Sequence, residues 1–163
     1  MKEYIILLIP SIVTATGFVF RFFWERHIKY TYTINEEHKT KIMFKLEKFY
    51  YPLHFNLNRL SNIWDILQER KKSNNDNTED IDIECMILHQ ENQDIIKSNI
   101  VQAKPIPKLL NSIMKYDKHV TIFKILKRCG SKCSSPRNYN AEYPEEFKDI
   151  IKRRIDILED ELI

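Results

Sequence analysis

The feature that most constrains this chain is an apolar stretch close to its first residue. Between Ile5 and Trp24 the only charged side chain belongs to Arg21. As an α-helix this stretch is about 30 Å long, which matches the hydrocarbon thickness of a bilayer. Arg21 lies within a turn of the far end, so its guanidinium can reach the headgroup region. Phe22, Phe23 and Trp24 then form an interfacial aromatic belt, and the stretch predicts a single membrane-spanning helix.

Two other interpretations of this stretch stay open. A cleaved signal peptide would use Ala15 and Gly17 as the small residues before the cut, but the mature chain would then begin with exposed aromatic residues. A buried core helix would need protein on every side, which is rare for so apolar a helix. We expect a membrane span, with residues 1–27 as the anchor and residues 28–163 as a helical domain.

Basic residues are unevenly distributed around the predicted span. On its N-terminal side, Lys2 is partly offset by Glu3, whereas its C-terminal side carries many basic residues: Arg21, Arg26, Lys29, Lys39, Lys41 and Lys45. The positive-inside rule therefore predicts a translocated N-terminus and a cytoplasmic body. The number of cysteines is small and odd: Cys85, Cys129 and Cys133. This is unlike the disulfide framework of a secreted protein, and the chain has no Asn-x-Ser/Thr acceptor for N-glycosylation.

The rest of the chain has apolar residues at helical spacing, which predicts an all-α fold. We expect Lys29–Ile34 to be an extended linker or helix continuation, although its alternation would also suit a short strand. Asn35 is the expected N-cap of a long helix. Its apolar stripe consists of Ile42, Leu46, Phe49, Leu53, Leu57, Leu60, Trp64 and Leu67. Pro52 interrupts this helix, because its ring clashes with the carbonyl of Lys48, and predicts a kink or break at Tyr50–Tyr51.

Three further helices are expected, so that four or five helices form a cytoplasmic bundle. A polar loop at 71–78 precedes the first of these helices, which begins around Thr78–Asp80. The expected buried residues of this helix are Ile83, Met86, Ile87, Ile95, Ile96 and Ile100. Pro107 starts the next, which buries Leu110, Ile113, Met114, Val120, Phe123 and Leu126 before a cap at Gly130. After a loop, Pro144 starts the last, which buries Phe147, Ile150, Ile151, Ile155, Leu158 and Leu162.

The chemistry-bearing residues form no catalytic or metal-binding motif. With 2 glycines the chain excludes glycine-rich phosphate loops, and 26 basic against 23 acidic residues argue against a specific nucleic-acid partner. Cys129 and Cys133, with His119 upstream, lack the second ligand pair that zinc needs. The histidines are scattered: His27, His38, His54, His89 and His119. We therefore predict no catalytic residue, no metal ligand and no cofactor.

Three clusters have an ordinary structural interpretation. The carboxylates Glu79, Asp80, Asp82 and Glu84 suit a solvated helix N-terminus. A moderately basic run suits a solvated face or contact with an anionic leaflet or phosphate: Lys124, Lys127, Arg128, Lys132 and Arg137. Ser11 and Ala15 form a small-xxx-small step that would let two anchors pack closely, so a homo-oligomer is one prediction.

Two short motifs give the chain a resemblance to a known group of proteins. They are Phe49-Tyr50-Tyr51-Pro52-Leu53 on the long helix and the Tyr-Pro-acid-acid-Phe step at Tyr143–Phe147. The order of segments resembles small uncharacterised single-pass helical proteins of bacteria and large DNA viruses. The resemblance implies an N-terminal span and a helical body, and no activity comes with it.

These observations favour a non-enzymatic membrane protein that presents a helical interaction or scaffold module to the cytoplasm. Its partners would be the bilayer, through residues 5–24, and an unidentified protein; in a virus it would serve a membrane of the particle. One alternative is a membrane-tethered enzyme or defence effector, which a deep pocket at Tyr50, His54 or His119 would favour. The other is a soluble helical protein with a buried first helix.

Overall fold

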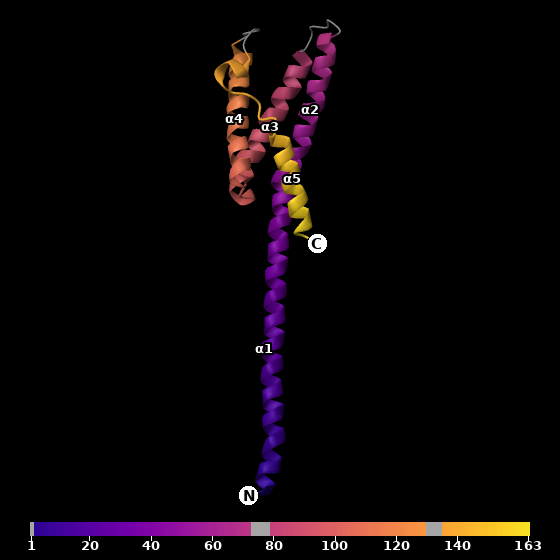
Figure 1. Ribbon diagram of the computed structural model, residues 1–163, viewed down its shortest axis with the longest axis vertical. Helices are drawn as coiled ribbons and strands as arrows, with labels where there is room; N and C mark the ends of the chain where they lie inside the picture. The colour runs from indigo at the N-terminus through magenta and orange to yellow at the C-terminus, as the bar shows by residue number, and fades with distance from the viewer. Residues whose placement is uncertain (1, 73–78, 130–134) are drawn as a thin grey trace. The chain divides into compact units, whose positions relative to one another are not determined.

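The structure is all-α, as predicted. The computed structural model describes the backbone of residues 2–72, 79–129 and 135–163, and their side chains except at 2–17, 19, 71 and 79. In chain order the elements are α1 (Lys2–Lys45), the π-helical η1 (Leu46–Tyr50), α2 (Tyr51–Lys72), α3 (Glu79–Ala103), α4 (Pro107–Arg128), the 3-10 helix η2 (Pro136–Tyr139) and α5 (Phe147–Asp160) (Figure 1). They form two compact units, Met1–Lys41 and Ile42–Ile163.

The first unit is a single helix that passes through the predicted linker. Lys29–Ile34 is helical, and Asn35 lies inside α1, so the predicted N-cap at Asn35 is wrong. Local side-chain bonds support the helix here: the Thr31 and Thr33 hydroxyls donate to the carbonyls four residues earlier, at 3.0 and 2.9 Å. Because the backbone before Asn35 is already helical, no free N–H groups remain for a cap.

Within the part of the chain that the structure describes, no helix is both long enough and apolar enough to cross a membrane. Most side chains of the predicted span at 5–24 lie outside the description, as do residues 73–78 of the predicted loop at 71–78. The anchor and its end at residue 27 therefore stay predictions.

Pro52 changes the helix type rather than ending the helix. The predicted disruption at Tyr50–Tyr51 coincides with the end of η1, where the Tyr51 N–H donates to the carbonyl of Leu46, five residues earlier. Proline has no N–H for the carbonyl of Lys48, and a wider π turn accommodates that missing bond without a break. Leu46, Phe49 and Tyr50 are all buried, so the π turn lies in the core.

The core of the second unit is built from η1 and α2–α5. η1 contacts α3 and α5, α2 packs on α3 and α5, and α4 packs on α3 and α5. The predicted inner face of α5 is confirmed, since Phe147, Ile150, Ile151, Ile155 and Leu158 are buried and Leu162 is partly buried. Each buried aliphatic or aromatic side chain contributes about 1.5–3 kcal/mol, so α5 is a main source of stability.

The predicted inner faces of the other helices are only partly right. Trp64 is 57% exposed at the end of the α2 stripe. On α3, Ile83 and Ile87 are exposed and Leu88 is buried instead. On α4, Leu110 and Met114 are exposed, whereas Leu109, Ser112, Ile113, Tyr116 and Val120 form the buried face. The reason is that polar residues share the buried faces of α3 and α4.

The connections agree well with the proline positions. Lys104 adopts a left-handed conformation, with φ of 47°, directly after α3, and α4 begins at Pro107 as predicted. The predicted start of the last helix at Pro144 is wrong, since α5 begins at Phe147, and the carbonyl of Pro144 accepts the Phe147 N–H at 2.9 Å in the turn before it. The predicted loop after α4 contains η2, and the predicted cap Gly130 lies outside the described residues.

Candidate functional site

A row of polar side chains is buried between α3 and α4. His89, Asn92 and Gln93 have spacings of three and four residues and therefore share one face of α3. They are 6%, 0% and 6% exposed. On α4, Ser112 and Tyr116 are fully buried one turn apart. Because a polar group costs free energy when it is buried without a partner, such a row indicates specific pairing between the two helices.

The hydroxyl of Tyr116 is the centre of this row. The amide Nδ2 of Asn92 donates to the Tyr116 oxygen at 2.9 Å, and Nδ1 of His89 lies 2.8 Å from the same oxygen. Since the oxygen accepts from Asn92, its own proton is available for His89 Nδ1. This pattern suits a neutral His89 with its ring proton on Nε2. Oδ1 of Asn92 and Oγ of Ser112 are buried without a hydrogen-bond partner in the described structure.

His119 extends the row toward the segment that precedes α5. Its Nδ1 donates to the carbonyl of Ala141 at 2.8 Å, because a carbonyl can only accept. The His119 ring lies 6.3 Å from the ring of His89 and 5.4 Å from the ring of Tyr143, between centroids. Tyr143 and Phe147 in turn pack on Tyr116, at 5.9 and 5.0 Å. The rings thus join α3, α4 and the start of α5.

A second polar row continues to the surface. Nε2 of Gln93 donates to Asp117 at 2.7 Å, and Nζ of Lys124 donates to Oε1 of Gln93 at 2.6 Å. Lys124 also donates to Gln90, and Lys127 forms an ion pair with Asp82. These bonds fix the register of α4 against α3 with polar groups on both helices.

Burial moves the proton equilibria of the polar row toward neutral forms. Loss of solvation, with His119 and Lys124 nearby, lowers the pKa of His89 to about 4. Loss of solvation also lowers the pKa of His119, and the hydrogen bond to Ala141 acts the other way. Burial raises the pKa of Tyr143 to about 12 and raises the pKa of Tyr116 as well. At neutral pH all four rings are therefore uncharged.

This geometry has a clear structural use. A neutral imidazole beside a phenol could in principle move a proton, but His89 and Tyr116 are sealed from solvent and from any dissolved substrate. The described residues contain no group of three His, Cys, Asp or Glu side chains that could hold a metal ion. The row instead specifies how α3 and α4 pair.

The sequence predicts no role for His89, names His119 only beside the cysteines and as a pocket candidate, and does not single out Asn92, Gln93 or Tyr116. The stretch from His89 to Gln93 is polar and interrupts the apolar pattern of this helix. The sequence does contain one signal, because the spacing of His89, Asn92 and Gln93 places these polar residues on one face of α3. Their hydrogen-bond partners, however, belong to α4.

Tyr50 and His54 are not members of this row. Tyr50 is buried in the apolar core, at 1% exposure, and His54 is half-buried next to Asn58. Burial and the charges of Lys148 and Lys152 lower the pKa of His54. Cys129 is exposed, and Cys133 lies outside the described residues.

The acidic cluster at the start of α3 has partners that the sequence did not reveal. Asp80 pairs with Arg70 and Glu84 pairs with Arg59, both on α2, at 2.9 and 2.6 Å. Together with the Asp82 pair to α4, these contacts tie three helices together. Such exposed pairs each contribute about 0–1 kcal/mol, so they guide packing more than they stabilise it.

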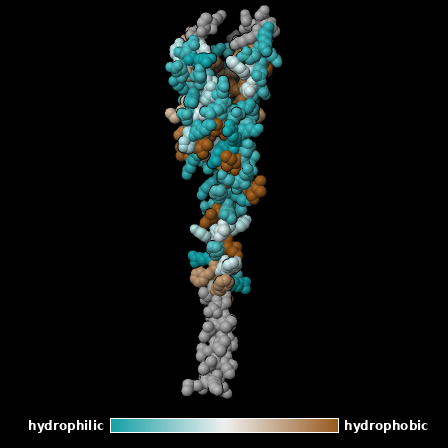
Figure 2. Space-filling model, in the orientation of Figure 1, coloured by the Kyte–Doolittle hydropathy of each residue, from teal (hydrophilic) through white to brown (hydrophobic). Residues whose placement is uncertain are grey.

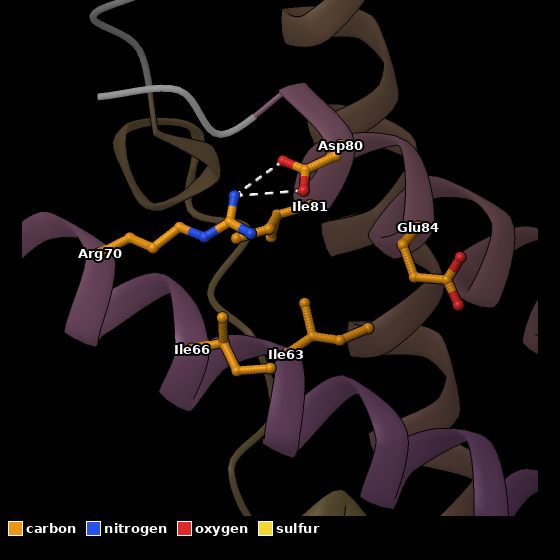
Figure 3. A pocket seen from close by; sticks show the side chains of 6 residues that line it. All are labelled: Ile63, Ile66, Arg70, Asp80, Ile81 and Glu84. Carbon is orange, nitrogen blue, oxygen red and sulfur yellow. Dashed lines mark hydrogen bonds and ion pairs between the residues drawn. The ribbon is translucent and has the colours of Figure 1, made fainter. Parts of the chain in front are cut away.

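Two of these acidic residues border a hollow between α2 and α3 (Figure 3). Ile63 and Ile66 of α2 and Ile81 of α3 form its apolar lining, and the Arg70–Asp80 pair closes one side. The hollow measures about 220 Å³ and opens to solvent, below the roughly 300–1,000 Å³ of small-molecule sites. It suits a single protruding side chain better than a cofactor.

The basic run is partly neutralised within the chain. Lys127 pairs with Asp82, and Arg137 pairs with Glu142 at 2.8 Å. Lys124 is held by glutamine oxygens, and Lys132 lies outside the described residues. The predicted contact with phosphate or an anionic leaflet therefore has less free charge available than the sequence indicates.

A second candidate surface is the aromatic part of α1. Its large apolar side chains are exposed: Phe18 76%, Phe20 68%, Phe22 57%, Phe23 63%, Trp24 56% and Ile28 51%. The rings of Phe20 and Trp24 stack at 5.9 Å, and Arg21 forms an ion pair with Glu25. Contiguous exposed apolar area of this kind marks a surface that binds a membrane or a partner.

Comparisons with known proteins add no relative: no family model matches the chain, and neither the curated proteins nor the solved structures give a significant match. The resemblance to single-pass helical proteins stays a prediction.

Proposed function

We propose that the chain is a non-enzymatic, single-pass membrane protein that presents its helical bundle to the cytoplasm as an interaction or scaffold module. The observation that carries the proposal is the exposed aromatic stretch of α1 at the end of the apolar run. A protein of this design could serve in the membrane of a virus particle.

The position of the aromatic stretch supports its proposed role as an interfacial belt. Phe22, Phe23 and Trp24 end the apolar run of Ile5–Trp24 and are all more than half exposed. Tryptophan and other aromatic side chains favour the headgroup level of a bilayer. Water alone would be a poor environment for so many neighbouring rings.

The length of α1 supports the same proposal. A helix of 44 residues extends about 66 Å, roughly twice the hydrocarbon thickness of a bilayer. Its second half carries exposed charged residues, including the Glu37–Lys41 ion pair, and thus suits an aqueous environment. One helix can therefore combine a lipid segment and a water-facing segment.

The second unit supplies the proposed interaction module. Its core is well filled, and its surface is largely hydrophilic with scattered hydrophobic residues, seen as teal and brown in Figure 2. Trp64 and Ile66 are exposed on α2, and Ile66 lines the hollow of Figure 3. A protein partner with a protruding apolar side chain is the ligand that this hollow suits.

The tethered-enzyme alternative finds little support in the positions of its candidate residues. Tyr50 is packed against Phe49 at 5.0 Å in the core, and His119 is bonded to the carbonyl of Ala141. The soluble alternative makes a different prediction in the experiment that follows.

The test is alkaline carbonate extraction of membranes from cells that express the full chain. We expect the wild-type chain in the membrane pellet, because a spanning helix resists extraction whereas a surface-bound protein does not. L8R/I12R should move the chain to the supernatant, since each arginine costs about 2.5–3.5 kcal/mol at the centre of a span.

The matched control is Y30R/I34R, which adds the same charges to the same helix after the apolar run. It should stay in the pellet. Protease added to sealed vesicles should digest the body when the cytoplasmic face is outside. Wild-type chain in the carbonate supernatant would contradict the proposal and favour the soluble alternative.

A further inference from the structure

The buried row between α3 and α4 has a chemical property beyond its packing: burial favours the neutral form of both of its histidines. His89 accepts the proton of Tyr116, whose oxygen already accepts from Asn92. If Nδ1 of His89 takes a proton, it must donate to the Tyr116 oxygen, and the Tyr116 proton loses its acceptor. A single protonation therefore reverses one buried hydrogen bond and leaves the buried proton of Tyr116 without its acceptor.

The surrounding charges offer no compensation for a positive His89. The charged groups that act on it are His119 and Lys124, both on α4, and both oppose a positive charge. The other titratable groups that act on the Tyr116 end are Cys85 of α3, Asp117 of α4 and Tyr143. Asp117 is exposed and accepts from Gln93, and Cys85 and Tyr143 are neutral groups whose pKa values burial raises.

His119 of α4 contacts the residues that precede α5. Its bond to the Ala141 carbonyl and its ring contact with Tyr143 hold the residues that lead into α5. The rings of His89 and His119 lie edge to face with their centroids 6.3 Å apart, so two protonated rings would repel within the bundle.

We propose that the His89–His119 pair is an acid-sensitive latch: when both rings are protonated, α4 and the segment 141–147 separate from α3. The latch is closed at neutral pH and opens at mildly acidic pH, where histidine is the residue that changes charge. The device belongs to the bundle and does not depend on the membrane anchor.

The direction of the effect follows from the two states of His89. Its pKa is about 4 in the closed bundle and 6.5 for an exposed histidine. Between these values the open form binds a proton that the closed form lacks, so acid favours opening as the pH falls from about 6.5 to 4. Above pH 6.5 the contribution is constant.

The test is hydrogen exchange of the full chain, measured by mass spectrometry at about pH 7 and pH 5 and corrected with the unfolded chain. We expect the opening constant of 107–128 and 141–147 to rise roughly tenfold or more in the wild type. H89Q/H119Q keeps an acceptor and a donor but cannot titrate, and its opening should rise far less. The matched control H38Q, at an exposed histidine of α1, should behave like the wild type.

Equal acid-induced opening in wild type and double variant would overturn the proposal, as would an absence of opening in the wild type. If the double variant does not fold, NMR titration of the wild-type imidazoles decides. A His89 midpoint below 6.5 that coincides with the opening supports the latch, and a midpoint at the ordinary value overturns it.

Discussion

At the scale of single residues, the second unit depends on one phenol that connects three segments. Tyr116 is fully buried, accepts from Asn92, pairs with His89 and packs on Phe147. A buried group with this many partners makes the arrangement of its neighbours specific, because each alternative packing leaves a polar atom unpaired.

The Tyr116→Phe substitution should therefore be costly although it removes a single oxygen. It leaves His89 Nδ1 and Asn92 Nδ2 buried without this partner, and we expect the free energy of unfolding to fall by about 1–3 kcal/mol. Urea unfolding followed by circular dichroism measures the change. Tyr139→Phe, at a half-exposed ring in η2, is the matched control and should stay within about 0.5 kcal/mol. Equal losses in the two variants would show that the hydroxyl network has no special weight.

At the scale of helices, apolar periodicity predicts a face correctly only when that face is wholly apolar. α5 meets this condition, since Ile150, Ile151 and Ile155 are buried as expected. α3 does not, because its buried face carries His89, Asn92 and Gln93 between Leu88 and Ile96. The apolar residues alone therefore predict a buried face that includes Ile83 and Ile87, which are exposed in the structure.

The proline positions were more informative than the caps. Pro52 and Pro107 act through their own rings and missing N–H groups, so their effects can be derived locally. The π turn that replaces a break, and the helix that passes through Asn35, depend on neighbouring residues and core packing. The buried hydrogen bonds of the candidate row could not be derived at all, because their donors and acceptors lie 24–27 residues apart.

Two neighbouring residues of α3 give a direct test of its orientation. Leu88→Ala should lower the free energy of unfolding by about 2–5 kcal/mol, because Leu88 is fully buried and its loss leaves a cavity. Ile87→Ala removes a similar volume from a side chain that is 47% exposed and should cost much less. Thermal or urea unfolding of both variants measures the difference. The reverse order would support the face predicted from the sequence.

At the scale of the second unit, α5 holds elements together that are distant in sequence. It contacts η1, α2 and α4, and Phe147 at its start packs on Tyr116. Two-state unfolding is the rule for small domains of this size, and shared contacts of this kind are its cause.

We therefore expect Phe147→Ala to loosen the whole unit rather than α5 alone. The loss of a fully buried ring should cost about 3–5 kcal/mol and reduce hydrogen-exchange protection in η1 and α4 together. Ile157→Ala, at a half-exposed position of the same helix, is the control. Loss of protection confined to α5 would contradict this cooperativity.

The contact between η1 and α5 also has a consequence for biosynthesis. Leu46–Tyr50 is translated long before Phe147–Asp160, yet each covers part of the other. While the ribosome is still making the intervening helices, the aromatic rings of the π turn lack part of their cover, and collapse cannot be completed. The nascent chain thus exposes part of the apolar surface of the π turn until α5 has been made.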